Sequence, residues 1–278
     1  MAGTLYLCAT PIGNLEDITF RVVNTLKEVD LIAAEDTRHS IKLLNHYNIK
    51  TSMTSYHEFN KIDKAKYLVK RMQAGENIAL VTDAGTPGIS DPGEELVKQC
   101  YEAGIEVTSL PGPAACITAL TLSGLSTRRF CFEAFLPADK RQKTSVLEEL
   151  KNETRTIIIY EAPHRLVRTL KDLEKVLGNR NLTLCKEITK KFENTFITNL
   201  SDAIIRYEGE VVKGEYVLVI EGKSYDKIKE EKEQVWNEFT VEEHFNYYIK
   251  QGIEKKEAMR MVAKDRGISK RDVYQKLI

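Results

Sequence analysis

The segment from residue 81 to residue 93 has the residue types that suit the binding of a small molecule. Three glycines and two prolines follow Asp83, and a second carboxylate stands at Asp91. Glycine lets the backbone approach a ligand closely, and proline limits the conformations that a loop loses on binding. The carboxylates add hydrogen-bond acceptors. An ordinary turn would need only one such glycine or proline, so we interpret the segment as a ligand-binding loop.

A strand and a helix are expected to hold this loop in place. The apolar run 78–81 predicts a buried strand, and a helical pattern begins near Glu94. The loop therefore leaves the carboxyl end of a strand. Small ligands bind just beyond these strand ends in open α/β sheets, which makes the loop the first candidate for a binding site.

Two other loops of similar composition follow predicted strands. One reads Thr10-Pro-Ile-Gly-Asn-Leu-Glu-Asp17, and the other reads Leu110-Pro-Gly-Pro-Ala-Ala115. Strands alternate with helices around them, which predicts right-handed crossovers and a mostly parallel sheet. We therefore expect all three loops to gather along one edge of one sheet. Asp17 is expected to cap the helix that follows it.

Three segments are expected in all. They are an N-terminal α/β domain over residues 1–122, a C-terminal α+β domain over residues 123–224 and a small helical module over residues 225–278. The second domain is expected to contain some antiparallel strand neighbours. A basic segment at residues 140–143 is expected to be a loop between a strand and a helix.

The last segment is polarised in charge. Residues 226–243 carry seven acidic and three basic residues, whereas residues 250–276 carry nine basic and four acidic ones. Helices are predicted over residues 254–264 and after a capping box formed by Ser269 and Asp272. Such a module could lie against phosphates. It could equally serve only in packing or dimerisation, because a run of lysines is often a solvated face.

The length and composition of the chain limit the kinds of protein that it could be. The chain has 278 residues, enough for two domains and an appendage, and its 41 basic residues equal its 41 acidic ones. Any nucleic-acid contact must therefore come from local patches. The five cysteines are widely spaced, which indicates neither a disulfide framework nor a metal site. Neither a signal peptide nor a membrane segment is expected, and we predict a cytoplasmic protein.

The loops also restrict the chemistry of the ligand. The sequence has neither a Gly-x-Gly-x-x-Gly fingerprint after its first strand nor a Walker phosphate loop. A ligand without a pyrophosphate is therefore favoured. Three loops lined by backbone groups suit a folded adenosine that carries an amino-acid tail.

Six motifs in sequence order resemble the bacterial ribosomal RNA small subunit methyltransferase I family, a group of tetrapyrrole methylase-type enzymes. Together they span roughly residues 4–222, and six motifs in one register are far more specific than any single motif. The motifs are Ala9-Thr-Pro-Ile-Gly-Asn-Leu-Glu-Asp-Ile18, Ala34-Glu-Asp-Thr-Arg38, Val81-Thr-Asp-Ala-Gly-Thr-Pro-Gly-Ile-Ser-Asp-Pro-Gly93, Leu110-Pro-Gly-Pro-Ala114, Tyr160-Glu-Ala-Pro-His-Arg165 and Lys186-Glu-Ile-Thr-Lys190.

The resemblance implies a two-domain tetrapyrrole methylase-like fold of the class III methyltransferases, with a small C-terminal helical module. It implies S-adenosyl-L-methionine-dependent methylation of a cytidine ribose 2'-hydroxyl in 16S rRNA of the 30S ribosomal subunit. It also implies a homodimer, with the cofactor in the cleft between the two α/β domains. The cofactor contacts that it implies are Pro11, Ile12, Asp83, Gly85, Ile89, Ser90, Pro113, Ala114, Glu161 and Ala162.

Methyl transfer to a hydroxyl needs in-line approach to the sulfonium methyl group and an acceptor for the hydroxyl proton. Asp36 is the first candidate base because it ends a strand at the same sheet edge, with Arg38 or His39 as a phosphate-binding or orienting group. His164 and Lys186 are the alternatives. Asp36 could instead be a helix N-cap, and the sequence does not separate these roles. No metal is required.

Two other classes of function remain open. An enzyme of the same fold could methylate a tetrapyrrole or a protein side chain, which would leave the basic segments without a role. A nucleotide-sensing or scaffold protein would keep the loops and need no base. Transfer of a labelled methyl group to RNA, to a tetrapyrrole or to neither would separate the three.

Overall fold

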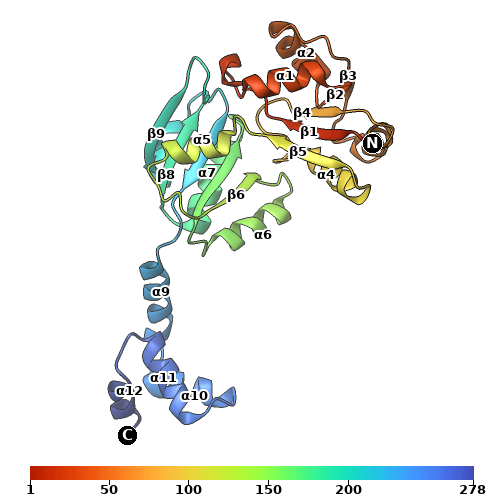
Figure 1. The fold of residues 1–278 in the computed structure, drawn as a ribbon. Coiled ribbons are helices and arrows are strands. Elements are labelled where there is room, and N and C mark those ends of the chain that lie inside the picture. The colour runs from red at the N-terminus through yellow and green to blue at the C-terminus, as the bar shows by residue number, and fades with distance from the viewer.

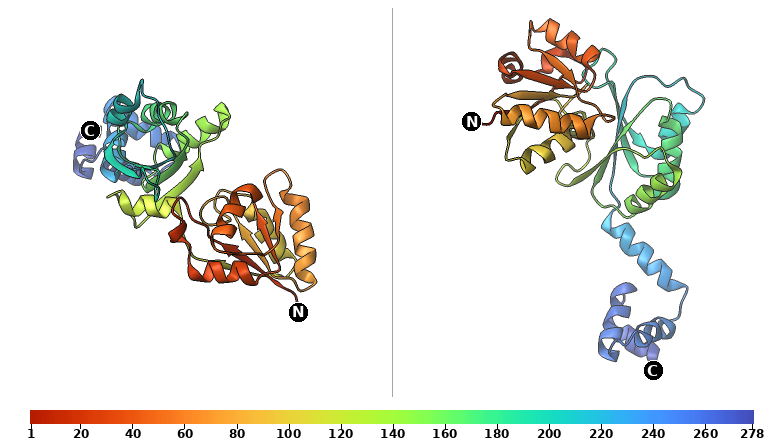
Figure 2. Two further views of the ribbon diagram at one scale, coloured as in Figure 1. Left: turned by 90° about the horizontal axis from the view of Figure 1, so that it is seen from above. Right: turned by 90° about the vertical axis from the view of Figure 1, so that its right-hand side faces the viewer.

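The computed structural model describes the backbone of residues 1–278 and all side chains except those of Lys232, Glu233, Val235 and Asn237. It contains two α/β domains and, at the end of a connecting helix, a module of three helices (Figures 1 and 2). Within the described part of the chain, every helix is too short or too polar to cross a lipid bilayer.

The first domain is built on a fully parallel sheet in the order β3-β2-β4-β1-β5. Its strands are β1 (Thr4–Cys8), β2 (Leu31–Ala34), β3 (Met53–Ser55), β4 (Ile78–Val81) and β5 (Glu106–Leu110). Its helices are η1 (Leu15–Asp17), α1 (Phe20–Glu28), α2 (Thr37–His46), α3 (Lys61–Gln73) and α4 (Gly93–Glu102). Helices α1 and α2 cover one face of the sheet, and α3 and α4 cover the other. The predicted parallel sheet is confirmed.

One local prediction in this domain is wrong. Asp17 ends the short η1 helix, and the side chain that caps α1 is that of Thr19, whose hydroxyl accepts a hydrogen bond from the Val22 amide. A hydroxyl at this position satisfies one of the free amides of the first helical turn. The carboxylate of Asp17 is therefore not used as the cap of α1.

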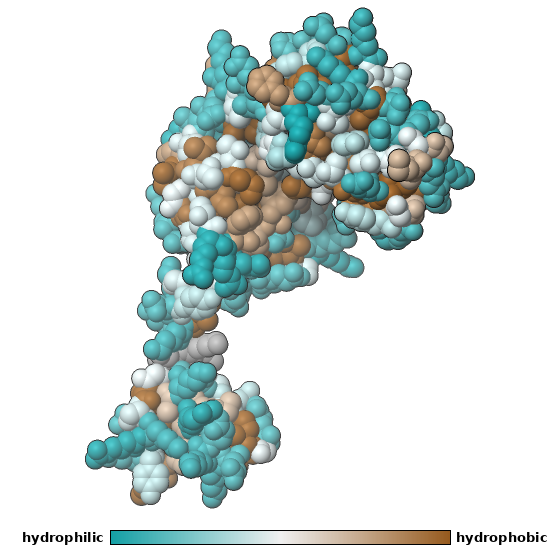
Figure 3. Space-filling model, viewed as in Figure 1, coloured by the Kyte–Doolittle hydropathy of each residue, from teal (hydrophilic) through white to brown (hydrophobic). Residues whose placement is uncertain are grey.

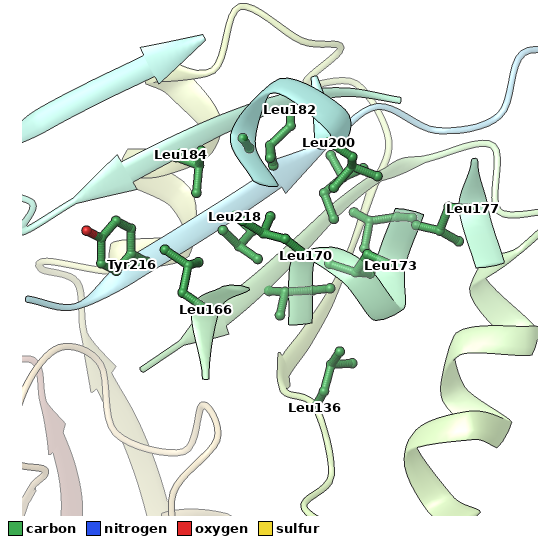
Figure 4. Packing of buried hydrophobic residues seen from close by; sticks show 14 of the residues in the cluster. Leu136, Leu166, Leu170, Leu173, Leu177, Leu182, Leu184, Leu200, Tyr216 and Leu218 are labelled. Carbon is green, nitrogen blue, oxygen red and sulfur yellow. The ribbon is translucent and has the colours of Figure 1, made fainter. Parts of the chain in front are cut away.

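The second domain has the sheet order β6-β7-β10-β8-β9, in which only β6 and β7 pair in parallel. Its strands are β6 (Phe130–Phe135), β7 (Thr156–Glu161), β8 (Asn181–Lys186), β9 (Asn194–Asn199) and β10 (Tyr216–Ile220). Its helices are α5 (Ala115–Leu122), α6 (Lys140–Leu150), α7 (Leu166–Leu177) and α8 (Leu200–Tyr207). Helix α7 packs four leucines on the sheet (Figure 4). Helix α5 covers the opposite face of this same sheet, so residues 115–122, which were expected in the first domain, pack on the second.

The basic segment 140–143 is the first turn of α6, and the expected loop is wrong. Asp139 caps the helix by accepting hydrogen bonds from the Arg141 and Gln142 amides at 3.0 and 2.9 Å. Lys143 is buried, and its ammonium lies 2.5 Å from the carboxylate of Asp172. Lys143 is therefore held inside the domain by an ion pair.

The C-terminal segment begins with α9 (Tyr225–Asn237), which leads away from the second domain (Figure 1). The helices α10 (Val241–Lys250), α11 (Lys255–Asp265) and α12 (Lys270–Leu277) share one small core. The predicted helices over 254–264 and after Ser269 are confirmed, including the Ser269–Asp272 capping box. Helices α9 and α10 were not individually predicted from the sequence.

Candidate active site

The loops after β1, β4 and β5 lie side by side at one edge of the first sheet. The three strands are neighbours and run parallel, so their carboxyl ends coincide. Thr10 and Gly85 exchange two backbone hydrogen bonds of 2.8 and 3.0 Å, and the Thr86 hydroxyl donates to the Pro113 carbonyl at 3.0 Å. The predicted gathering of the three loops is confirmed.

The second domain supplies the facing wall of the site. Strand β10 runs antiparallel to β7 and β8, so that Tyr216 at its start pairs with both Glu161 and Lys186 at their ends. The loops after β7 and β8 and the segment before β10 therefore meet at one edge of the second sheet. This edge faces the three loops of the first domain.

A cavity of about 400 Å³ lies between these two edges. Its lining is mostly apolar and includes Ile12, Gly85, Ile89, Ala114, Glu161 and Ala162 among the predicted cofactor contacts. Pro113 lines a second, adjoining hollow, whereas Pro11, Asp83 and Ser90 are not among the described residues that line either space. The structure thus brings together most of the predicted contacts from both domains.

The two aspartates of the long loop shape its backbone. The Asp91 carboxylate accepts hydrogen bonds from the amides of Gly88, Ile89 and Gly93, and burial raises the pKa of Asp91. Asp83 accepts a hydrogen bond of 3.1 Å from the Asp36 amide. Burial, and after it the nearby charge of Glu35, raise the pKa of Asp83. These carboxylates fix the loop, and their oxygens point to backbone amides.

The candidate bases stand outside the cavity lining. Asp36 caps α2, and the Arg38 guanidinium beside it holds the pKa of Asp36 at about 2. His164 is exposed, and the Lys186 ammonium lies 5.9 Å from the centre of the Tyr216 ring. Asp36, Arg38, His164 and Lys186 are all absent from the described residues that line the cavity.

The cavity wall contains a charged pair that was not predicted from the sequence. The Lys190 ammonium lies 2.8 Å from Glu215 and 3.0 Å from Glu187, and both Lys190 and Glu215 line the cavity. Lys190 belongs to a motif already recognised, but Glu215 reaches the site only because β10 lies between β7 and β8.

An aromatic group forms another part of the wall that was missed. The Tyr160 oxygen accepts a hydrogen bond of 3.1 Å from the Cys116 amide, which ties β7 to α5. Phe135 lies edge-on to the Tyr160 ring at 5.7 Å between ring centres, and both residues line the cavity. Burial raises the pKa of Tyr160 above the usual value of 10.

The two domains meet closely where the first loop crosses the second domain. A Cβ atom at Gly13 would stand 2.4 Å from Cγ of Lys190 and 2.8 Å from Oγ1 of Thr189. The Asn14 amide donates a hydrogen bond of 3.1 Å to the Thr189 hydroxyl. A side chain at residue 13 would therefore separate the two edges that enclose the cavity.

Comparison with known proteins places the chain in a family. Residues 4–204 match the family described as Tetrapyrrole (Corrin/Porphyrin) Methylases. The chain belongs to this methylase family. A similar protein from Halalkalibacterium halodurans is 50% identical over 98% of this chain and 93% of its own length, and one from Bacillus subtilis is 46% identical over the same shares. Both are named ribosomal RNA small subunit methyltransferase I.

The fold of this methyltransferase is shared with solved structures of low sequence identity. Diphthine synthase superposes with a TM-score of 0.64 at 12% identity, over 80% of this chain and 91% of that one. The methyltransferase CobJ superposes with a TM-score of 0.60 at 18% identity, over 80% and 95% of the two chains. These similarities establish the class III methyltransferase fold. Among the described side chains, no cluster of three or more His, Cys, Asp or Glu residues could hold a metal ion.

Proposed function

We propose that this enzyme transfers a methyl group from S-adenosyl-L-methionine to the ribose 2'-hydroxyl of a cytidine in 16S rRNA of the 30S subunit. The observation that carries the proposal is the identity of 46–50% with relatives named ribosomal RNA small subunit methyltransferase I, over 98% of the chain. The alternative acceptors, a tetrapyrrole or a protein side chain, have the support of the fold alone.

The residues of the cavity fit this cofactor. Its volume of about 400 Å³ lies in the range of small-molecule sites. Gly85, Ala114 and Ala162 present backbone groups and small side chains to it, which suits the close packing of a nucleoside. Lys190 and Glu215 offer opposite charges to the carboxylate and ammonium of an amino-acid tail.

The bound cofactor would supply an electrophilic methyl group on a sulfonium. The protein has to hold the acceptor oxygen in line with that group and to exclude water, and such alignment lowers the barrier by several kcal/mol. Walls from two domains suit this task because Gly13, Asn14 and Thr189 join them beside the cavity.

The charges of the C-terminal module support the proposal that rRNA is the partner. Eight basic side chains of α10, α11 and α12 are exposed, namely Lys250, Lys255, Lys256, Arg260, Lys264, Lys270, Arg271 and Lys276. Exposed lysines and arginines of this kind bind phosphates with an affinity that falls as salt rises. We propose that the module holds rRNA while the cavity performs the transfer.

A homodimer in the cytoplasm completes the proposal. The motifs that the chain shares with the family support the dimer. Sedimentation equilibrium of the purified protein would test it, since a mass near 31.7 kDa at micromolar concentration would contradict a dimer.

Transfer of a labelled methyl group decides the proposed function. The purified enzyme and radiolabelled S-adenosyl-L-methionine would be incubated with 30S subunits, with a tetrapyrrole and with a protein extract. Label in 16S rRNA, recovered as 2'-O-methylcytidine, is the expected result. Label in the tetrapyrrole or the protein alone would overturn the proposal.

A further inference from the structure

A second hollow of about 420 Å³ borders the cavity, because Ile12 and Ala114 line both spaces. Its other walls are the two short loops of the first domain, the exposed side of α5 and Thr189 of the second domain. Three of its lining residues, Ile12, Pro113 and Ala114, are also among the predicted cofactor contacts, so the hollow directly adjoins the expected cofactor site. Its position next to the cavity makes it available to the other reactant.

A hydrogen bond between the two domains holds the walls of the hollow together. The Asn14 amide donates to the Thr189 hydroxyl, which holds the first loop against the connection between β8 and β9. Thr189 itself has a φ of 65°, a conformation that is unfavourable for a β-branched residue. Such strain persists only where the surrounding contacts enforce it, and it is often found at functional sites.

Asp17 gives the hollow a proton acceptor. Among the described residues that line it, Asp17 is the one with an ionisable side chain. The other polar groups are the hydroxyls of Thr118 and Thr189, which bond to the Ala114 carbonyl and the Asn14 amide. The hollow is thus a mostly apolar space with one carboxylate.

Two exposed aromatic residues lie a few positions along the chain from residues that line the hollow. Phe20 follows Asp17 by three residues and is 92% exposed, and Phe192 follows Thr189 by three residues and is 70% exposed. Arg21 and Lys191 adjoin them, and the Lys191 ammonium lies 5.8 Å from the centre of the Phe192 ring. Exposed rings beside basic groups are typical of surfaces that stack unpaired nucleotides.

We propose that this hollow receives the acceptor nucleotide, with Asp17 accepting a hydrogen bond from its ribose hydroxyl and Phe20 and Phe192 stacking neighbouring bases. This inference rests on the proposed function. As the new O–C bond forms, the S–C bond breaks with its electron pair left on sulfur. The hydroxyl proton passes to the Asp17 carboxylate and then to solvent.

Stacking is tested by binding alone, without cofactor. A variant with Phe20→Ala and Phe192→Ala should bind 30S subunits and a cytidine-containing single-stranded RNA at least about tenfold more weakly, because each stacked base contributes strongly. Phe59→Ala is the matched control, since Phe59 is 97% exposed beside α3. Equal affinity of the double variant and the wild type for both RNAs would overturn the stacking surface.

The role of Asp17 is tested by separating binding from transfer. Asp17→Asn keeps the shape of the side chain and should lower single-turnover transfer about 10²-fold, with calorimetric cofactor affinity and RNA affinity unchanged. Asp63→Asn is the control, because the Asp63 side chain is 95% exposed on α3. A normal rate in Asp17→Asn beside an active wild type would overturn the Asp17 role alone, whereas a wild type inactive on RNA would overturn the proposed function.

Discussion

Gly13 couples the two domains because it has no side chain. Alanine at this position would place its Cβ 2.4 Å from Cγ of Lys190, so the first loop would have to move away from the second domain. We expect Gly13→Ala to lower single-turnover methyl transfer by about 10²-fold, the effect of a misplacement near 1 Å. Cofactor affinity measured by calorimetry should fall as well.

Asn24→Ala, on the exposed face of α1, is the control for this variant. Wild-type cofactor affinity and transfer rate in Gly13→Ala, with normal circular dichroism, would show that the contact between Gly13 and Lys190 does not hold the cavity in shape.

Asp36 is the residue whose two possible roles the sequence left open. Its carboxylate accepts hydrogen bonds from the Arg38 amide and guanidinium, and the pKa of about 2 makes it a weak proton acceptor. We expect Asp36→Asn to keep the cap and to transfer methyl groups at a rate close to that of the wild type. A fall of about 10²-fold in the same single-turnover assay would instead support Asp36 as the base.

At the scale of the element, Glu161 fixes the end of β7. Its buried carboxylate accepts hydrogen bonds from the Ala162 amide and the Thr169 hydroxyl, and it lies 3.5 Å from Nε of Arg165. Glu161→Gln would place an amide group beside these donors. We expect a loss of about 2 kcal/mol in the free energy of unfolding, measured by urea denaturation.

The exposed Glu148→Gln on α6 provides the comparison, since the Glu148 side chain is 57% exposed. Equal stability of the two variants would mean that the hydrogen bonds of Glu161 do not stabilise the second domain.

Helices α9 and α10 meet in an aromatic contact, and we expect its contribution to stability to depend on pH. The His244 ring stacks on Trp236 at 3.4 Å, the Arg266 guanidinium donates to its Nδ1, and the Asp265 carboxylate lies 3.5 Å from its Nε2. Burial, and after it the charge of Arg266, lower the pKa of His244 from 6.5 to about 4. Between these values the unfolded chain binds a proton that the folded module does not, so stability should fall as pH falls from about 6.5 to about 4.

Trp236 is the one tryptophan of the chain, so its fluorescence reports on this contact during unfolding. His244→Phe should remove most of the pH dependence. A module equally stable at pH 7.5 and pH 5 in the wild type would contradict the neutral, buried state of His244.

The sequence predicted the elements whose signals are local. Buried apolar strands followed by glycine and proline indicated the parallel sheet, and the parallel order brought Ile12, Gly85 and Ala114 to one cavity. Glu215 and Tyr216 were missed because their position depends on β10 pairing with β7 and β8 across long stretches of chain. Helices α9 and α10 were missed because their acidic run was interpreted as composition and not as helical pattern.

At the scale of the whole molecule, the apolar surface over α5 lies apart from the C-terminal module (Figures 1 and 3). Apolar residues gather over α5, where Ile117 and Leu122 are exposed, while hydrophilic side chains cover much of the C-terminal module (Figure 3). A deletion beginning at Lys250 would cut through the core that α10 shares with α11 and α12. Neutralising the charges therefore tests the module more cleanly than truncation.

Replacement of five exposed basic residues by glutamine should weaken 30S binding and flatten its dependence on salt, because fewer counterions are released. These residues are Lys255, Lys256, Lys264, Lys270 and Arg271. The control replaces five exposed lysines of the first domain, namely Lys27, Lys42, Lys50, Lys70 and Lys98. Equal salt slopes for the two variants would contradict an RNA-holding module.

Helix α9 sets the distance between the second domain and the three-helix module. Its 13 residues span about 20 Å, and its far end is locked to α10 by the stacked rings of Trp236 and His244. Inserting whole helical turns would shift the module along the axis, whereas inserting half a turn would also swing it to the opposite side of the axis. Under the proposed function, the nucleotide that reaches the cavity would be selected by its distance and direction from the nucleotides that the module holds.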